Sequence, residues 1–102
     1  MSVDNSQLMM IRHAECVANN QGLICGLTDS PLSKDGQLSL DILSTVSIGS
    51  HWSVYSSTLS RAANTAKSIF SKNKIEYTKN LVEIDYGLLE MHSKSKHDGE
   101  LI

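Results

Sequence analysis

Arginine and histidine stand side by side at positions 12 and 13, at the end of the short apolar run that begins at Leu8. A neutral histidine can attack phosphorus through one ring nitrogen when the other is fixed, usually by a backbone carbonyl. A neighbouring guanidinium can bind phosphoryl oxygens through two parallel hydrogen bonds and neutralise their charge. The pair therefore suggests phosphoryl chemistry, although a structural arginine beside a hydrogen-bonded histidine is the default interpretation for the pair alone.

A second polar cluster, Ser57 and Arg61 in "YSSTLSRAANTA", changes this balance. Apolar residues recur at helical spacing from Leu59 to Phe70, so we expect a helix there, with Ser57 capping its N-terminus. The free N–H groups of a helix N-terminus bind anions, and Arg61 in the first turns adds a guanidinium. The two clusters together predict an anion pocket with two arginines and one histidine.

Glu83, in "LVEIDYG", is the best candidate for the acid that protonates a leaving group. It follows a short extended segment and precedes Gly87, a residue type that permits a tight bend. A carboxyl group placed beside the leaving oxygen can donate its proton in the transition state. For Glu83 alone, a solvated loop carboxylate is the favoured interpretation, so its role depends on the other motifs.

The elements that must position these residues alternate between strand and helix. Short apolar runs predict strands, and helical spacing predicts helices, with Ser33 as an N-cap. The expected elements are a strand at 7–13, a helix at 33–46, a strand at 52–57, a helix at 59–70, a strand at 75–78 and mostly irregular chain at 81–102. This order predicts an α/β protein, part of a three-layer α/β/α fold with a mainly parallel sheet. Ligands of such sheets bind beyond the carboxyl ends of the strands, where both clusters fall.

Composition limits the classes of function. The 102 residues fit one compact domain, and 40% hydrophobic and 20% charged residues are typical of a globular chain. The 9 Lys+Arg against 11 Asp+Glu, without a long basic run, argue against nucleic acid as a partner. The N-terminal sequence resembles neither a signal peptide nor a membrane anchor, so we expect a cytoplasmic location and no membrane association.

The cysteines and the remaining histidines predict no metal site. Cys16 and Cys25 are too few and too badly spaced for a disulfide framework or a zinc knuckle, and we interpret them as small, partly buried thiols. His51 precedes a predicted strand on the side away from the pocket. His92 and His97 lie in a polar tail, where solvated side chains are the better interpretation.

Three stretches of the chain resemble the histidine phosphatase superfamily, in its phosphoglycerate mutase-like branch: "IRHAECVANNQGLICGLTDSPLSKDGQ", "VYSSTLSRAANTA" and "LVEIDYGLLE". The family pattern runs R-H-G-E-x-x-x-N, then G-x-x-D-x-P-L-[ST]-x-x-G, then S-x-L-x-R-A-x-x-T, then E-x-x-x-G-x-x-E. All four motifs occur here in this order, from Gln7 to about Glu90, with Ala14 in place of the first glycine. The resemblance therefore extends over most of the chain.

The resemblance implies a role for each matching residue. His13 would be the nucleophile that becomes phosphorylated, and Glu83 would be the proton donor. Arg12 and Arg61 would bind the phosphoryl oxygens, with help from Asn19. The implied reaction is hydrolysis of a phosphorylated small molecule through a phosphohistidine, with no metal and no cofactor, because the arginines supply the charge that Mg²⁺ supplies in other enzymes.

The resemblance also implies a longer domain. Its members carry a second histidine in a Ser-His-Gly-Gly-like turn that completes the phosphate pocket, and this sequence has no such turn. We therefore expect residues 1–102 to be the N-terminal part of a single histidine phosphatase domain, with the C-terminal half absent and the activity impaired by truncation. An uncovered edge of a parallel sheet would then favour self-association.

Two other functions stay open. Mutases of the family carry E-R-H-Y-G at the acid motif, whereas residues 83–87 read E-I-D-Y-G, which is close to the phosphatase-type E-I-D-F-G. Phosphoglycerate mutase-type phosphoryl transfer therefore ranks below hydrolysis. The other alternative is a non-catalytic remnant that binds phosphate or a protein partner, because intact motifs do not by themselves show turnover.

Overall fold

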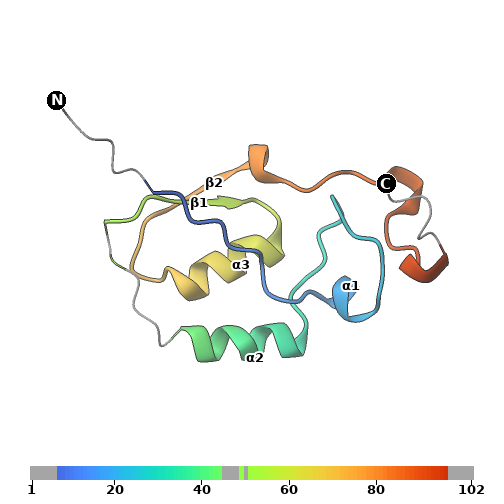
Figure 1. The fold of residues 1–102 in the computed structure, drawn as a ribbon, viewed down its shortest axis with the longest axis horizontal. Coiled ribbons are helices and arrows are strands. Elements are labelled where there is room, and N and C mark those ends of the chain that lie inside the picture. The colour runs from blue at the N-terminus through green and yellow to red at the C-terminus, as the bar shows by residue number, and fades with distance from the viewer. Residues whose placement is uncertain (1–6, 45–48, 50, 97–102) are drawn as a thin grey trace.

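The computed structural model describes residues 7–44, 49 and 51–96. Its helices and strands are α1 (Val17–Asn20), α2 (Lys34–Leu43), β1 (Val54–Ser57), α3 (Ser60–Ile69) and β2 (Ile75–Thr78). Short 3₁₀ turns follow at η1 (Lys79–Leu81), η2 (Gly87–Leu89) and η3 (Lys94–Lys96). In Figure 1 the sheet, α3 and α2 lie one above another, and the chain after β2 runs across to the α1 end of the molecule.

The sheet within the described residues consists of β1 and β2, which pair in parallel. Their register places Val54 opposite Ile75 and Ser57 opposite Thr78. Parallel neighbours need a crossover connection, and α3 provides it and packs on both strands (Figure 1). α2 packs in turn on α3. The predicted α/β class with a parallel sheet is confirmed.

α2 has the predicted N-cap, but two of the apolar residues that predicted the helix are exposed. Ser33 caps it as predicted, because its Oγ accepts a hydrogen bond from the N–H of Gly36 at 3.0 Å. The helix ends at Leu43, and positions 45–46 of the predicted helix lie outside the described residues. Leu38 and Ile42, two residues whose spacing predicted the helix, are exposed. Leu40 is the side chain that the helix buries.

The predicted strand at 7–13 is wrong as an element. The segment is not assigned as a strand, and its N–H and C=O groups make no backbone hydrogen bond to any other described residue. Leu8 and Met10 are 87% and 88% exposed. The apolar composition of the run gave the prediction, but a strand also requires a hydrogen-bonded neighbour, which composition does not reveal.

The predicted cap of α3 by Ser57 is also wrong. Ser57 closes a short turn instead, in which its Oγ accepts a hydrogen bond from the N–H of Leu59 at 3.1 Å, and Leu59 occupies the N-cap position without a side-chain bond. The first-turn N–H of Ser60 donates to Oδ1 of Asp29 at 2.7 Å, and the Ser60 hydroxyl donates to the same oxygen. A carboxylate from a distant loop therefore satisfies this helix N-terminus.

The stretch after β2 is held against the rest of the chain by backbone hydrogen bonds. The N–H of Ile24 donates to the carbonyl of His92 at 2.7 Å, and the N–H of Lys94 donates to the carbonyl of Gly22 at 2.9 Å. The N–H of Met91 donates to the carbonyl of Ile24 at 2.5 Å. The segment around His92 is therefore attached to the chain that follows α1, and His97 lies outside the described residues.

Candidate active site

His13 lies just after the extended segment, and one of its ring nitrogens is fixed. Nδ1 lies 2.6 Å from the carbonyl oxygen of Ala14. A carbonyl only accepts hydrogen bonds, so Nδ1 must carry the proton, and in the neutral ring Nε2 then keeps its lone pair. This is the tautomer that a nucleophilic histidine requires, and the backbone of the next residue imposes it.

The surroundings of His13 favour its neutral form. Desolvation by partial burial is the largest cause that lowers the pKa of His13 below its ordinary value of 6.5. The positive charges of Arg61 and Arg12 lower the pKa further, whereas the hydrogen bond to Ala14 and the negative charge of Glu83 raise it. The net effect is a lowered pKa, so the ring is predominantly neutral at neutral pH.

The lowered pKa leads to a prediction about stability. The unfolded chain binds a proton at His13 more readily than the folded chain, so the free energy of unfolding should fall as pH decreases through the ordinary histidine range. His13→Gln should weaken this dependence between about pH 5 and pH 7, a window set around the usual histidine value. Urea denaturation across this range measures it, and an identical pH dependence in both proteins would contradict it.

Thr65 ties the His13 loop to α3. The N–H of Ala14 donates to Oγ1 of Thr65 at 3.0 Å, and this hydroxyl donates to the carbonyl of Arg61 at 2.7 Å. Thr65 is buried. Thr65 is the final residue of the S-x-L-x-R-A-x-x-T motif, but the motif alone assigned no function to it. Its position one helical turn after Arg61 was the available signal, because residues four apart lie on the same helix face.

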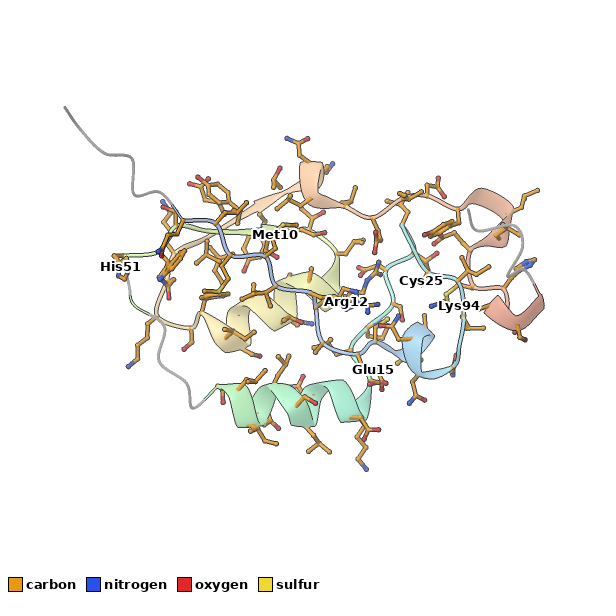
Figure 2. The ribbon with its side chains drawn as sticks, in the orientation of Figure 1. Met10, Arg12, Glu15, Cys25, His51 and Lys94 are labelled. Carbon is orange, nitrogen blue, oxygen red and sulfur yellow. The ribbon has the colours of Figure 1, made fainter. Side chains whose placement is uncertain are left out.

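An open hollow of about 1030 Å³ runs between the extended segment, the two strands and α3. Arg12, His13 and Glu83 all contribute to its lining, together with Thr65. Arg12 and Glu83 are exposed. Figure 2 shows Arg12 on the extended segment between Met10 and Glu15. The structure thus brings three of the five predicted site residues to one hollow.

Arg61 is oriented differently from the predicted arrangement. Its side chain is only 2% exposed, and its guanidinium donates to the carbonyl of Thr28 at 2.6 Å and to the carbonyl of Gly26. Sγ of Cys25 lies 3.5 Å from the same group. Arg61 does not line the hollow, although its charge acts on His13. The guanidinium is therefore held by the loop that carries residues 25–28.

Asn19 lies on α1 and also stays outside the hollow. Its Oδ1 accepts a hydrogen bond from the N–H of Cys16 at 3.2 Å, which is the reciprocal half of a capping box. The side chain is half-buried. Its oxygen is therefore engaged in capping the N-terminus of α1, and it is not directed at the other predicted site residues.

Neither a metal cluster nor a membrane-spanning helix is found where the structure is described. No group of three or more His, Cys, Asp or Glu side chains that could hold a metal occurs among residues 7–44, 49 and 51–96. Within the same ranges no helix is long and apolar enough to cross a bilayer. Both cysteines are free thiols; Cys16 is buried and Cys25 is half-buried.

On this α/β scaffold, a histidine with a fixed tautomer shares a hollow with one arginine and one carboxylate, and the charge of a second arginine acts on the histidine. A family model confirms the resemblance drawn from the motifs, because the histidine phosphatase superfamily (branch 1) matches residues 8–100. The chain belongs to this superfamily. No curated protein matches it significantly.

Solved structures of phosphatases share the fold. Phosphoserine phosphatase from Entamoeba histolytica, in complex with 3-phosphoglyceric acid, superposes with a TM-score of 0.75 at 29% identity, over 87% of this chain and 45% of that one. Alpha-ribazole phosphatase from Shigella flexneri superposes with a TM-score of 0.71 at 30% identity, over 88% and 46%. The chain therefore spans about half the length of the structures it matches.

Proposed function

We propose that the chain hydrolyses phosphomonoesters through a phosphohistidine formed on His13. The observation that carries the proposal is the hydrogen bond from Nδ1–H of His13 to the carbonyl of Ala14, because it leaves Nε2 with a free lone pair. The lowered pKa supports the same role, since a neutral ring is the nucleophilic form. Membership of the histidine phosphatase superfamily supports hydrolysis of a phosphomonoester as the class of reaction.

In this reaction His13, Glu83 and Arg12 have different roles. Nε2 of His13 attacks phosphorus, an N–P bond forms, and the bond from phosphorus to the leaving oxygen breaks. Glu83 donates its proton to that oxygen, and then accepts a proton from the water that attacks the phosphohistidine. Arg12 neutralises charge on the phosphoryl oxygens throughout. Inorganic phosphate leaves and both His13 and Glu83 return to their starting forms.

Two further predicted residues complete this proposal, and the substrate class follows from relatives. Arg61 would contribute to phosphoryl binding through its charge, and Asn19 would contribute by fixing the turn after the histidine loop. The Entamoeba histolytica phosphatase has been solved with 3-phosphoglyceric acid, and a mutant of it with phosphoserine. Both ligands are small phosphorylated acids, which supports a phosphorylated small molecule as the substrate of this chain.

The direct test is turnover of a generic phosphomonoester, p-nitrophenyl phosphate, at mildly acidic pH. We expect release of inorganic phosphate together with an acid-labile, base-stable phosphoprotein. Phosphate release without that phosphoprotein would remove the phosphohistidine from the mechanism. A folded protein that gives neither product would overturn the hydrolase proposal.

One observation favours a second candidate, a non-catalytic protein that binds phosphate. The guanidinium of Arg61 is already hydrogen-bonded to two carbonyls, so of the two predicted arginines Arg12 alone is available to phosphoryl oxygens at the hollow. Titration of inorganic phosphate into the isotope-labelled protein tests this role. Shifts of the His13 and Arg12 resonances without any turnover of p-nitrophenyl phosphate would establish it.

The exposed segment 7–13 supports the proposal that the chain self-associates. Its backbone makes no hydrogen bond to the backbone of other residues that the structure describes, and Leu8 and Met10 are exposed, so the segment resembles an open sheet edge, which readily pairs with another chain. We expect the sedimentation coefficient to rise with protein concentration. Met10→Lys should reduce this rise, because a charge blocks edge pairing, whereas Leu88→Lys, at a 94% exposed position outside the segment, should not. A concentration-independent monomer would contradict the proposal.

A further inference from the structure

Glu90 has the most hydrogen-bonded carboxylate among the described residues, and the proposed reaction does not use it. Its Oε1 accepts hydrogen bonds from the Thr28 hydroxyl at 2.6 Å and from the Thr28 N–H at 2.8 Å. The N–H of Gly26 donates to Oε2 at 2.9 Å and to Oε1 at 3.1 Å. The N–H of Tyr86 donates to Oε2 at 3.1 Å. Every donor belongs to the 26–28 loop or to the acid-motif segment.

The same loop is held from its other side by Arg61. Gly26 and Thr28 direct their N–H groups to Glu90 and their carbonyls to the guanidinium of Arg61. The loop therefore lies between a carboxylate and a guanidinium. A buried guanidinium needs its acceptors in fixed positions, since leaving donors unsatisfied is costly. Any contact that fixes the 26–28 loop therefore also fixes the orientation of the Arg61 guanidinium.

The loop touches the acid-motif segment at a second point. A Cβ on Gly26 would fall on the carbonyl oxygen of Ile84, the residue after Glu83. Such close contact of two backbones is possible only for glycine. The bond from the Tyr86 N–H to Glu90 then holds the segment four residues before Glu90. The 26–28 loop therefore contacts both Arg61 and the segment that carries Glu83.

We propose that Glu90 is a positioning residue, whose carboxylate holds the 26–28 loop and thereby sets Arg61 and Glu83 relative to His13. It does not line the hollow and touches no reacting atom. The importance of Glu90 for catalysis rests on the proposed function. Its effect on the placement of Arg61 and Glu83 does not. The charges of Arg61, Arg12 and Glu83 all act on His13, and these residues come from three separate parts of the chain.

The titration of His13 distinguishes positioning from a direct charge effect. The positive charge of Arg61 lowers the pKa of His13. When Glu90→Gln releases the loop, Arg61 should move and the pKa of His13 should rise. Loss of a negative charge acting directly on His13 would instead lower that pKa. The two explanations therefore predict opposite signs, and neither depends on turnover.

The experiment follows the His13 ring resonances by NMR against pH in four proteins: wild type, Glu90→Gln, Thr28→Val and the control Asp41→Asn. Thr28→Val removes one donor to Glu90 and nearly keeps the volume of the side chain, so it serves if Glu90→Gln does not fold. Asp41→Asn removes a carboxylate at an exposed position of α2 that does not line the hollow. We expect an upward shift in Glu90→Gln, a smaller upward shift in Thr28→Val, and none in Asp41→Asn.

The same variants separate this inference from the proposed hydrolysis. If the wild type turns over p-nitrophenyl phosphate, kcat/KM should be highest in the wild type, lower in Thr28→Val and lowest in Glu90→Gln. An upward shift in a protein without turnover supports positioning and rejects the hydrolase. Unchanged or lowered His13 titration in a folded Glu90→Gln or Thr28→Val protein would overturn the inference, even if their turnover were reduced.

Discussion

His13→Ala should abolish both phosphate release and the acid-labile phosphoprotein. The substitution removes the only atom, Nε2, that the proposed mechanism uses to form the bond to phosphorus, so no other group at the hollow takes over the step. We expect turnover to fall by at least about 10³-fold, as in other enzymes that lose their nucleophile. Steady-state assays with p-nitrophenyl phosphate measure the loss, and trapping of radiolabelled phosphoprotein measures the intermediate.

His51→Ala is the matched control for this substitution. His51 packs its ring beside Trp52, with centroids 5.8 Å apart, and it is not among the residues that line the hollow. Its removal should leave turnover unchanged. Circular dichroism and denaturation must show that His13→Ala is folded. Turnover that survives in folded His13→Ala would take the nucleophilic role away from His13.

The helices and strands of this chain were largely predictable because they depend on neighbours in sequence. β2 occupies the predicted residues 75–78, and α3 lies within the predicted 59–70. Ser33 caps the N-terminus of α2 through a bond to a residue three positions away, so the local pattern contained the necessary information. The segment at 7–13 failed because strand formation depends on a partner that is remote in sequence.

Three of the five predicted site residues line one hollow, but the hydrogen bonds that hold the surrounding loops could not be predicted. The Arg-His pair and Glu83 reach the same hollow, as their positions after predicted extended segments suggested. The capping of α3 by Asp29 and the anchoring of the 26–28 loop by Glu90 join residues 31 and more than 60 positions apart. No periodicity or local motif encodes such contacts, and only the folded chain reveals that Arg61 is directed at carbonyls.

Gly26→Ala should strongly destabilise the fold. The added Cβ would fall on the carbonyl oxygen of Ile84, and it would also meet the Tyr86 ring at 2.9 Å. A backbone carbonyl cannot rotate away as a flexible side chain does, so the loop and the acid-motif segment must separate. We expect the free energy of unfolding to fall by about 3 kcal/mol, at the upper end of overpacking costs.

Gly22→Ala is the control that separates collision from backbone strain. Gly22 has a φ of +67° and no atom within 4 Å of an added Cβ, so this substitution strains the backbone without a collision. It should cost about 1 kcal/mol, the usual cost of a left-handed conformation for alanine. Equal losses in urea denaturation of the two variants would contradict the argument. A larger loss in Gly26→Ala, accompanied by a raised pKa of His13, would show that this single contact joins the stability of the fold to the geometry of the site.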